Sequence, residues 1–324
     1  LLDRLLQMLA EAGILALTQN KESWQVLHTP TPRLPQAERQ RLQTAYGAVI
    51  DAELTLLARC AAGLSEVLRG VRNPLELLFP GGDASSVNRT YQNSPIAQAM
   101  NRLAQNAVLI ALAQLPPGRG VRILEIGAGT GGTTAGLLPL LPADQTDYLF
   151  TDIGAGFLRT AQEKFADYPF LRYQTLDIEQ PPAQQGIDLH NYDIVLAANV
   201  LHATRDLPTT LAHVQQLLAP GGLLVLLEDT QASGWVDLTF GLTDGWWRFS
   251  DQRQQHPLLP VDQWQQLLLT AGFQTVATLP DAHIEAAGRI RIEDGERNRK
   301  LVIVRDDGEE DVEYLLPRRV RLDW

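Results

Sequence analysis

A glycine-rich stretch, Val121–Thr134, constrains this chain more than any other part of its sequence. It reads Val-Arg-Ile-Leu-Glu-Ile-Gly-Ala-Gly-Thr-Gly-Gly-Thr-Thr, so that an apolar segment runs into a turn. The apolar residues predict a buried strand, and the leucines between Leu137 and Leu141 predict a helix after the turn. Glycines let a backbone approach a ligand closely, and the first turn of a helix offers unpaired N–H groups. The stretch therefore predicts a cofactor site.

Two kinds of cofactor are compatible with these glycines. Gly127, Gly129 and Gly132 satisfy the dinucleotide fingerprint, and Asp152 follows about 20 residues later, where an acid that binds ribose is expected. Glu125 distinguishes the two, because a carboxylate two residues before the first glycine would repel a pyrophosphate. The same carboxylate would attract a ligand with an ammonium and a sulfonium group. It favours S-adenosylmethionine, and a glycine turn without any ligand is the remaining alternative.

Composition excludes several classes of protein. The 324 residues, 45% of them hydrophobic, can bury a large core and form one large domain or a core with an accessory unit. The formal net charge of −11 argues against a nucleic-acid partner, which would require clustered Lys and Arg. No apolar run approaches the ~18 residues of a membrane helix, so we expect no membrane partner.

Cysteine usage and the first residue indicate the context of the chain. Its single cysteine, Cys60, permits neither an internal disulfide nor a thiolate metal cluster. This fits a reducing cytoplasm, and we expect neither a signal peptide nor a metal site. Because the chain begins with Leu1 and not with Met, we expect a fragment of a longer protein.

Strand-like and helical segments alternate from residue 121 onward, which predicts an α/β fold with a mostly parallel sheet and helices on both faces. The N-terminal residues are mainly helical and carry no catalytic signature. We expect them to cover and pack against the core, or alternatively to line a substrate entrance. The predicted domains are an accessory or lid subdomain (1–92), the cofactor-binding core (93–305), and an acidic linker with the start of a following region (306–324).

Ligands of open α/β sheets bind at the carboxyl ends of the strands, where several polar residues of this chain fall. We expect Asp152 to bind the ribose hydroxyls and Asn199 to contact the methionine end. Asp177 and Ile178 would border the adenine. The alternatives are a helix cap for either acid and a tight turn for Asn199. The predicted cofactor-binding residues are Glu125, Gly127, Ala128, Gly129, Gly131, Asp152, Ile153, Asp177, Ile178 and Asn199.

The first motif, an acid and a hydrophobic residue before Gly-x-Gly-x-Gly, resembles that of class I methyltransferases, whose fold is Rossmann-like. Three further segments, Ala198–Thr204, Leu226–Thr230 and Phe240–Phe249, together resemble the C-methyltransferase domains of polyketide synthases. The resemblance covers nearly the whole chain, including Pro74–Pro80 and the Tyr91-x-x-Ser-Pro segment. It implies S-adenosylmethionine as cofactor, with S-adenosylhomocysteine as product.

The resemblance also implies a reaction and its partners. The substrate would be a β-ketoacyl thioester on the phosphopantetheine arm of an acyl carrier protein, methylated at its α-carbon among neighbouring synthase domains. His202 and Glu228 match the catalytic pair of the family, and Tyr91 matches a tyrosine near the substrate. We assign Phe240, Trp246 and Trp247 to the substrate tunnel, with core packing as the alternative.

The chemistry of such a substrate requires a base. An α-carbon between two carbonyls is not nucleophilic until it loses a proton, and imidazole, with a reference pKa of about 6.5, is the usual base at neutral pH. Of the six histidines, only His202 directly follows a predicted strand at the cofactor edge, and Glu228 ends the neighbouring strand. The alternative for His202 is a structural histidine. We interpret the others as surface residues: His28, His190, His213, His256 and His283.

Two other functions are compatible with the sequence. One is an N- or O-methyltransferase acting on a small molecule or a peptide intermediate, whose acceptor already has a lone pair. The other is a noncatalytic module that keeps the fold and docks a carrier protein.

Overall fold

The chain divides into two compact units in the computed structural model, which describes residues 1–18, 20, 23–31, 35–46, 50–83, 85–92, 94–116, 118–279 and 299–305. The first unit comprises Leu1–Pro95 and Ala232–Trp247, and the second comprises Ile96–Gln231 and Arg248–Trp324. Residues 232–247, which the sequence placed in the core, thus group with the N-terminal residues. The predicted acidic linker (306–324) lies outside the described residues.

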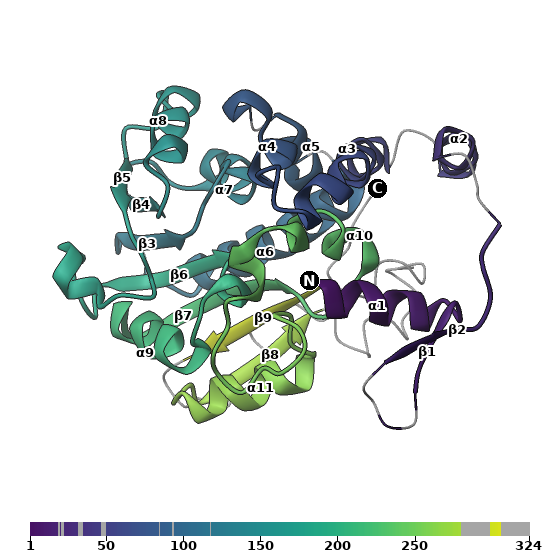
Figure 1. Ribbon diagram of the computed structural model, residues 1–324. Helices are drawn as coiled ribbons and strands as arrows, with labels where there is room; N and C mark the ends of the chain where they lie inside the picture. The colour runs from purple at the N-terminus through teal and green to yellow at the C-terminus, as the bar shows by residue number, and fades with distance from the viewer. Residues whose placement is uncertain are drawn as a thin grey trace. The chain divides into compact units, whose positions relative to one another are not determined.

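The second unit is built on a seven-stranded sheet with the order β5-β4-β3-β6-β7-β9-β8 (Figure 1). The neighbours from β5 to β7 pair in parallel, and β9 is antiparallel to both β7 and β8. The predicted mostly parallel sheet is confirmed. The strands are β3 (Val121–Ile126), β4 (Thr146–Asp152), β5 (Leu171–Thr175), β6 (Tyr192–Ala198), β7 (Leu218–Asp229), β8 (Thr275–Leu279) and β9 (Arg299–Arg305).

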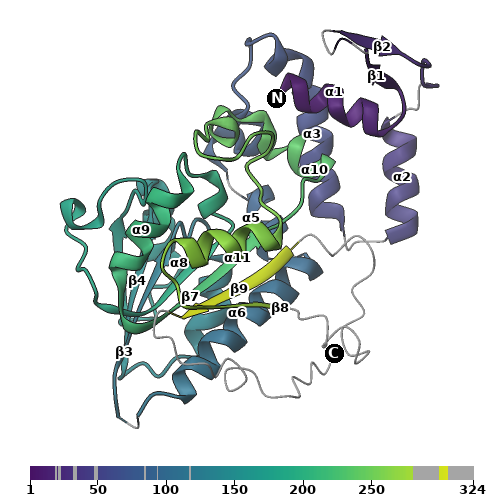
Figure 2. The ribbon, with the colours of Figure 1, turned by 90° about the horizontal axis from the view of Figure 1, so that it is seen from below.

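Helices cover both faces of this sheet because successive strand residues point to opposite sides. Ile123 and Phe150 pack into one hydrophobic core, whereas their neighbours Leu124 and Leu149 pack into the other. Burial on both faces explains why these strands read as continuous apolar runs. Figure 2 shows α6 and α11 on opposite sides of β8 and β9. The helices are α6 (Pro95–Ala113), α7 (Gly132–Leu137) and α8 (Ala155–Lys164) at the first core, and α9 (Leu207–Leu217) and α11 (Val261–Thr270) at the second.

Two element boundaries differ from those predicted. Strand β5 ends at Thr175, so Asp177 lies in the following loop and not at the strand end. The Pro220-Gly221-Gly222 sequence predicts a turn before a strand, but it lies inside β7, where Gly221 has a φ of 75°. The pairing with β6 shifts register opposite this segment, so these residues form an irregularity within one long strand.

The first unit is mainly helical, with one antiparallel hairpin. Its core is centred on Leu56, Cys60, Leu77 and Leu242, the last contributed by the returning segment 232–247. Burial raises the pKa of the Cys60 thiol to about 11. The elements are α1 (Leu2–Glu11), β1 (Leu15–Leu17), β2 (Trp24–Val26), α2 (Pro35–Tyr46), α3 (Asp51–Leu68), α4 (Leu75–Leu78), α5 (Ser85–Gln92) and α10 (Gly234–Asp237).

A buried ion pair ties the returning segment to the N-terminal helix of this unit. Arg4 on α1 donates from Nε to Oδ2 of Asp237 on α10 at 2.8 Å. The Asp237 side chain is 0% exposed, and that of Arg4 is 10% exposed. Because an unpaired carboxylate at such a position is costly, the pair holds the two segments together.

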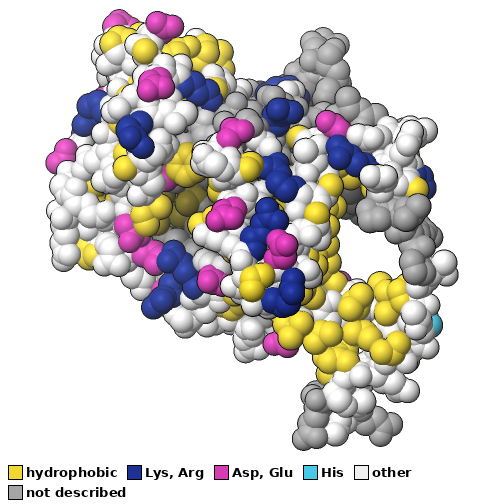
Figure 3. All heavy atoms as spheres, turned by 45° about the horizontal axis from the view of Figure 1, so that its top comes forward, with side chains coloured by type: hydrophobic (Ala, Val, Ile, Leu, Met, Phe, Trp, Pro, Cys, Tyr) yellow, Lys and Arg dark blue, Asp and Glu magenta, His cyan; other side chains and the backbone are white. Residues whose placement is uncertain are grey.

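The surface carries charges of both signs. Lys and Arg side chains alternate with Asp and Glu on the face shown in Figure 3, where hydrophobic side chains also gather in patches. Each helix within the described ranges is too short or too polar to cross a membrane. In the same ranges, no three His, Cys, Asp or Glu side chains come together as a metal site.

Candidate active site

The glycine loop after β3 is shaped by positions where a side chain cannot fit. Gly127 has a φ of 58°, and a Cβ atom there would lie 2.3 Å from Cγ2 of Val200. Gly131 has a φ of 68°, and its Cβ would lie 2.6 Å from the ring of Phe165. The loop therefore packs directly against the segment that follows β6 and against the end of α8. The contact with Val200 places it beside the turn that carries His202.

The middle of the loop is more open. A Cβ atom at Gly129 would meet no heavy atom closer than the Gly127 carbonyl oxygen, at 3.8 Å. The Gly129 N–H donates to Oδ2 of Asp152 at 2.9 Å, and the Ala128 N–H donates to the Thr151 carbonyl at 2.9 Å. These bonds fix the loop backbone to the end of β4.

Asp152 is 6% exposed, and both of its carboxylate oxygens contact the backbone. Besides the bond to Gly129, Oδ1 accepts from the N–H of Gly154, the residue before α8, at 2.7 Å. Burial raises the pKa of this carboxyl. A carboxylate oxygen has a second lone pair, so these contacts leave acceptor capacity for ribose hydroxyls. The neighbouring Ile153 is 67% exposed and offers an apolar surface.

Glu125 has internal partners. Its carboxyl is 1% exposed and accepts at Oε2 from the hydroxyls of Thr134, at 2.5 Å, and Tyr148, at 2.7 Å. Burial raises the pKa of Glu125 to about 7, so at neutral pH the group is only partly charged. The electrostatic attraction that favoured a sulfonium ligand is therefore weaker than the sequence argument assumed. Glu125 instead joins β3, α7 and β4 behind the loop.

Three further predicted cofactor residues have structural contacts of their own. Oδ1 of Asp177 accepts from the Glu179 N–H at 3.0 Å, which forms a local turn. Ile178 is 5% exposed and packs in the second core. Asn199 has a φ of 52° and accepts at Oδ1 from the Asp229 N–H at 3.2 Å. The contact of Asn199 fits its tight-turn alternative, whereas that of Asp177 forms a local turn in place of the alternative helix cap. Binding roles for the three residues stay predictions.

His202 and Glu228 meet as predicted from their neighbouring strands. Nδ1 of His202 lies 2.5 Å from Oε2 of Glu228, and the two residues are 6% and 0% exposed. The other oxygen, Oε1, accepts from the backbone N–H of Leu201 at 2.8 Å. A carboxylate on Nδ1 fixes the tautomer with the proton on that nitrogen, so Nε2 is the atom that can take up a proton. The pair has the form of a general base and its orienting acid.

The interpretation of His213 as a surface residue is wrong. It is 8% exposed, and its Nδ1 contacts the carbonyl of Ile178 at 2.8 Å. Helix α9 turns this residue toward the second core, which the sequence interpretation did not take into account. His28 and His190 are exposed and His256 is half-buried, whereas His283 lies outside the described residues.

The predicted substrate residues belong to the first unit, whereas His202 and Glu228 belong to the second. The ring of Tyr91 packs 5.7 Å from that of Phe240, centroid to centroid. Trp246 is 8% exposed, and Nε1 of Trp247 donates to the Gly241 carbonyl at 2.7 Å. These aromatic residues thus pack within the first unit, as the core-packing alternative expects. Their role in a substrate tunnel stays a prediction.

Comparison with known proteins identifies the family. Residues 124–224 match the methyltransferase domain family. The crystal structure of the CurJ carbon methyltransferase superposes with a TM-score of 0.88 at 48% identity, covering 94% of this chain and 79% of that one. The chain belongs to the polyketide synthase carbon methyltransferases. The methyltransferase domain of the citrinin polyketide synthase also matches, with a TM-score of 0.84 at 29% identity, covering 95% of this chain and 78% of that one.

The relatives in sequence are much longer proteins. The methyltransferase is 42% identical over 230 residues to the non-reducing polyketide synthase adrD of Penicillium rubens, covering 69% of this chain and 9% of the synthase. It is 40% identical over 249 residues to the polyketide synthase ThaG of Burkholderia thailandensis, covering 74% of this chain and 4% of the synthase. The chain thus spans about a tenth or less of the length of the curated relatives it matches.

Sequence reasoning missed the residues that contact Glu125 and the backbone of His202. Thr134 and Tyr148 bind Glu125, and Arg253 donates to the His202 carbonyl at 2.7 Å. Tyr148 lies on β4, which pairs with the strand of Glu125, so strand pairing could have pointed to it. Thr134 lies in the glycine-rich motif but on α7, so its contact depends on how the helix packs. Arg253 lies in a loop without periodicity, and no pattern in the sequence points to it.

Proposed function

We propose that this methyltransferase transfers a methyl group to the α-carbon of a β-ketoacyl chain held as a thioester on an acyl carrier protein. The observation that carries the proposal is the buried contact of 2.5 Å between His202 Nδ1 and Glu228 Oε2. The pair lies beside the glycine loop, because Gly127 packs against Val200, two residues before His202. Membership in the polyketide synthase family supports the acyl substrate, the carrier protein and neighbouring synthase domains as partners.

The residues present fit S-adenosylmethionine as cofactor. Bound there, it would supply an electrophilic methyl group on a sulfonium. The open backbone at Gly129 would accommodate the methionine portion, and Asp152, already at the carboxyl end of β4, would bind the ribose. Ile153, at 67% exposure, would contact the adenine. Glu125 would act by holding the loop through Thr134.

The catalytic pair would generate the nucleophile. Nε2 of His202 would take the α-proton, and the electron pair left on the α-carbon would form the new bond to the methyl carbon. The S–CH₃ bond of the sulfonium would break in the same step, so that S-adenosylhomocysteine would be the leaving group. Glu228 accepts the hydrogen bond of Nδ1 throughout and stabilises the imidazolium while it exists. Tyr91 would hold the substrate carbonyl or enolate, and Phe240, Trp246 and Trp247 would line the acyl tunnel.

The buried pair favours a carbon acceptor over oxygen or nitrogen. An amine or hydroxyl acceptor already carries a lone pair, whereas a carbon acid needs a positioned base. Holding a carboxylate at 0% exposure is costly, and here it is compensated by contacts to the imidazole and to the backbone. We infer that the pair is kept for proton abstraction, in a cytoplasmic synthase.

Transfer of labelled methyl from S-adenosylmethionine to acetoacetyl-carrier protein tests the proposal, with mass spectrometry locating the label. Label on the α-carbon is the expected result. Label on oxygen or nitrogen would establish one of the other methyltransferase classes. No transfer by folded protein that still binds the carrier would establish a docking module.

A further inference from the structure

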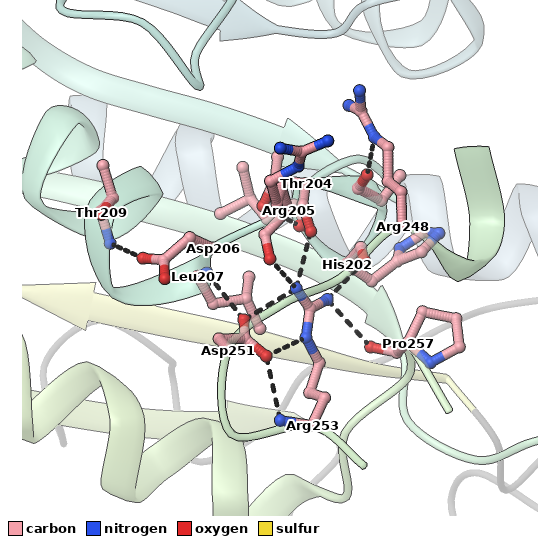
Figure 4. A network of polar contacts seen from close by, with 12 residues as sticks. His202, Thr204, Arg205, Asp206, Leu207, Thr209, Arg248, Asp251, Arg253 and Pro257 are labelled. Carbon is pink, nitrogen blue, oxygen red and sulfur yellow. Dashed lines mark hydrogen bonds and ion pairs between the residues drawn. The ribbon is translucent and has the colours of Figure 1, made fainter. Parts of the chain in front are cut away.

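Arg253 lies inside the turn that carries His202. Its side chain is 0% exposed. The guanidinium donates from Nη1 to the His202 carbonyl at 2.7 Å, and from Nη2 to the Thr204 carbonyl at 2.6 Å and the Arg205 carbonyl at 3.3 Å. Figure 4 shows the guanidinium enclosed by the turn, with its bonds reaching these carbonyls. The guanidinium thus binds three of the four carbonyl oxygens of residues 202–205.

Asp251 compensates the buried charge of Arg253. Its Oδ1 accepts from Nε at 2.8 Å, and its Oδ2 lies 2.8 Å from Nη2. Oδ2 also accepts from the backbone N–H of Leu207 at 2.9 Å, at the start of α9. The ion pair therefore joins the turn to the helix that follows it. A planar guanidinium with bidentate contacts holds its partners in a defined geometry.

The two sides of the His202 peptide are held by opposite charges. On the N–H side, Oε1 of Glu228 accepts from the backbone N–H groups of Leu201, at 2.8 Å, and His202, at 3.4 Å. Arg253 binds the carbonyl side. Residues Leu201–Ala203 form only a single 3-10 turn, a conformation with weak internal hydrogen bonding. The direction of the imidazole therefore depends on these two side chains.

We propose that Arg253 is the positioning residue for His202, fixing the turn so that Nε2 points to the α-carbon. This inference rests on the proposed role of His202 as the base. A base must lie within hydrogen-bond reach of its proton, and a displacement of 1 Å can lower a rate by about 10²-fold. Arg253 acts through the backbone of His202 and does not itself touch the substrate.

The test compares Arg253→Met and Arg253→Lys with the control Asp193→Asn. Asp193 lies at the amino end of β6, is 8% exposed, and accepts from Arg119 at 2.5 Å and from the Arg122 N–H at 2.9 Å. The Asp193 side chain is 7% exposed, close to the 2% of Asp251, and it lies at the opposite end of the strand that leads to His202.

We expect kcat per S-adenosylmethionine-binding site to fall about 10²-fold in Arg253→Met, with KM for acetoacetyl-carrier protein unchanged. Arg253→Lys keeps the positive charge but lacks the planar guanidinium that binds several oxygens at once. Its kcat per site should therefore fall less than that of Arg253→Met. Asp193→Asn should lose thermal stability and keep its kcat per site. An Arg253→Met protein with wild-type kcat per site would reduce Arg253 to a stabilising residue and overturn the proposal.

A second measurement keeps the two proposals apart. ¹⁵N NMR of histidine-labelled protein, with the His202 signals assigned by their loss in His202→Ala, reports the tautomer of the ring directly. We expect one tautomer in the wild type and a mixture in Arg253→Lys, whether or not His202 is the base. An unchanged tautomer together with unchanged kcat in Arg253→Lys would overturn the inference even if Arg253→Met does not fold. If His202 is not the base, the His202→Ala protein will keep its methyl transfer, and this result is independent of the tautomer measurement.

Discussion

The carboxylate of Glu228 contacts the side chain of His202 and the backbone of the preceding residue, Leu201. One oxygen lies 2.5 Å from His202 Nδ1, and the other accepts from the Leu201 N–H at 2.8 Å. A glutamine in its place would keep one acceptor and present an N–H₂ group on the other side. With its oxygen toward the imidazole, the amide presents N–H₂ to the Leu201 N–H and loses that contact. With its N–H₂ toward the imidazole, Nδ1 becomes the acceptor and the ring proton moves to Nε2, so that Nε2 can no longer take up a proton.

Substitution of the pair should separate chemistry from binding. We expect His202→Ala to abolish methyl transfer and enzyme-catalysed exchange of the α-proton, with S-adenosylmethionine still bound. Glu228→Gln should lower the rate by roughly 10²–10⁴-fold, the usual contribution of positioned acid–base catalysis. Deuterium incorporation into acetoacetyl-carrier protein measures the exchange step alone. Exchange at the normal rate in His202→Ala would mean that another group is the base.

Asp152 should contribute to cofactor affinity. Asp152→Ala removes charge-assisted hydrogen bonds to ribose and should weaken S-adenosylmethionine binding by about 1.5–3 kcal/mol, as measured by titration calorimetry. Asp147→Ala is the matched control, because that acid lies on the same strand but pairs with Arg172 at the surface. Equal affinities of the two variants would remove Asp152 from the site.

Glu125 should make stability depend on pH in the direction opposite to most acids. Its folded-state pKa of about 7 lies above the unfolded value of about 4.3, because burial disfavours the charged form. Its contribution to the free energy of unfolding is therefore full below about pH 4.3 and is lost as the pH rises through about 7.

Comparison with Glu125→Gln isolates this contribution. The free energy of unfolding of the wild type, measured in urea relative to the variant, should fall by on the order of 3 kcal/mol from pH 4.5 to about 8. A difference that stays level over this range would show that the carboxyl is charged in the folded protein at low pH.

At the scale of elements, the sequence predicted those features that follow from hydrophobic periodicity and from the order of strands and helices. Apolar runs located the strands, and strand order placed His202 just after one strand and Glu228 at the end of its neighbour, where they meet. Arg253 could not be predicted, because its contacts depend on the path of a loop and not on a repeating pattern. The partial charge of Glu125 could not be predicted either, since it follows from burial that only the packed structure defines.

The ion pair between α1 and α10 should contribute strongly to the stability of the first unit. Arg4→Met would remove the ion pair that Asp237 makes at 0% exposure, and should lower the free energy of unfolding by about 3–5 kcal/mol in chemical denaturation. The control is Glu11→Gln, since Glu11 is 63% exposed and contacts the same guanidinium at 2.6 Å. Glu11→Gln should lower the free energy of unfolding by less than about 1 kcal/mol. Equal losses would mean that the buried pair has no special role.

At the scale of the whole molecule, one predicted catalytic residue lies in the first unit and two lie in the second. Tyr91→Phe tests whether the first unit contributes to chemistry, because it removes the hydroxyl and retains the ring that packs 5.7 Å from Phe240. We expect kcat for methylation to fall at unchanged thermal stability. Phe240→Leu, which alters the packing and keeps the hydroxyl, is the control for stability. A Tyr91→Phe protein with normal turnover would contradict the assigned role.

The return of residues 232–247 to the first unit has a consequence for recombining synthases. A graft that begins at Ile96 would carry Asp237 and Leu242 into the recipient without Arg4 and without the core around Leu56. The orphaned segment would expose apolar surface and a buried acid at once. Donor fragments for exchanging this methylation step should therefore include residues 1–95 together with the core, because no single cut separates the two units.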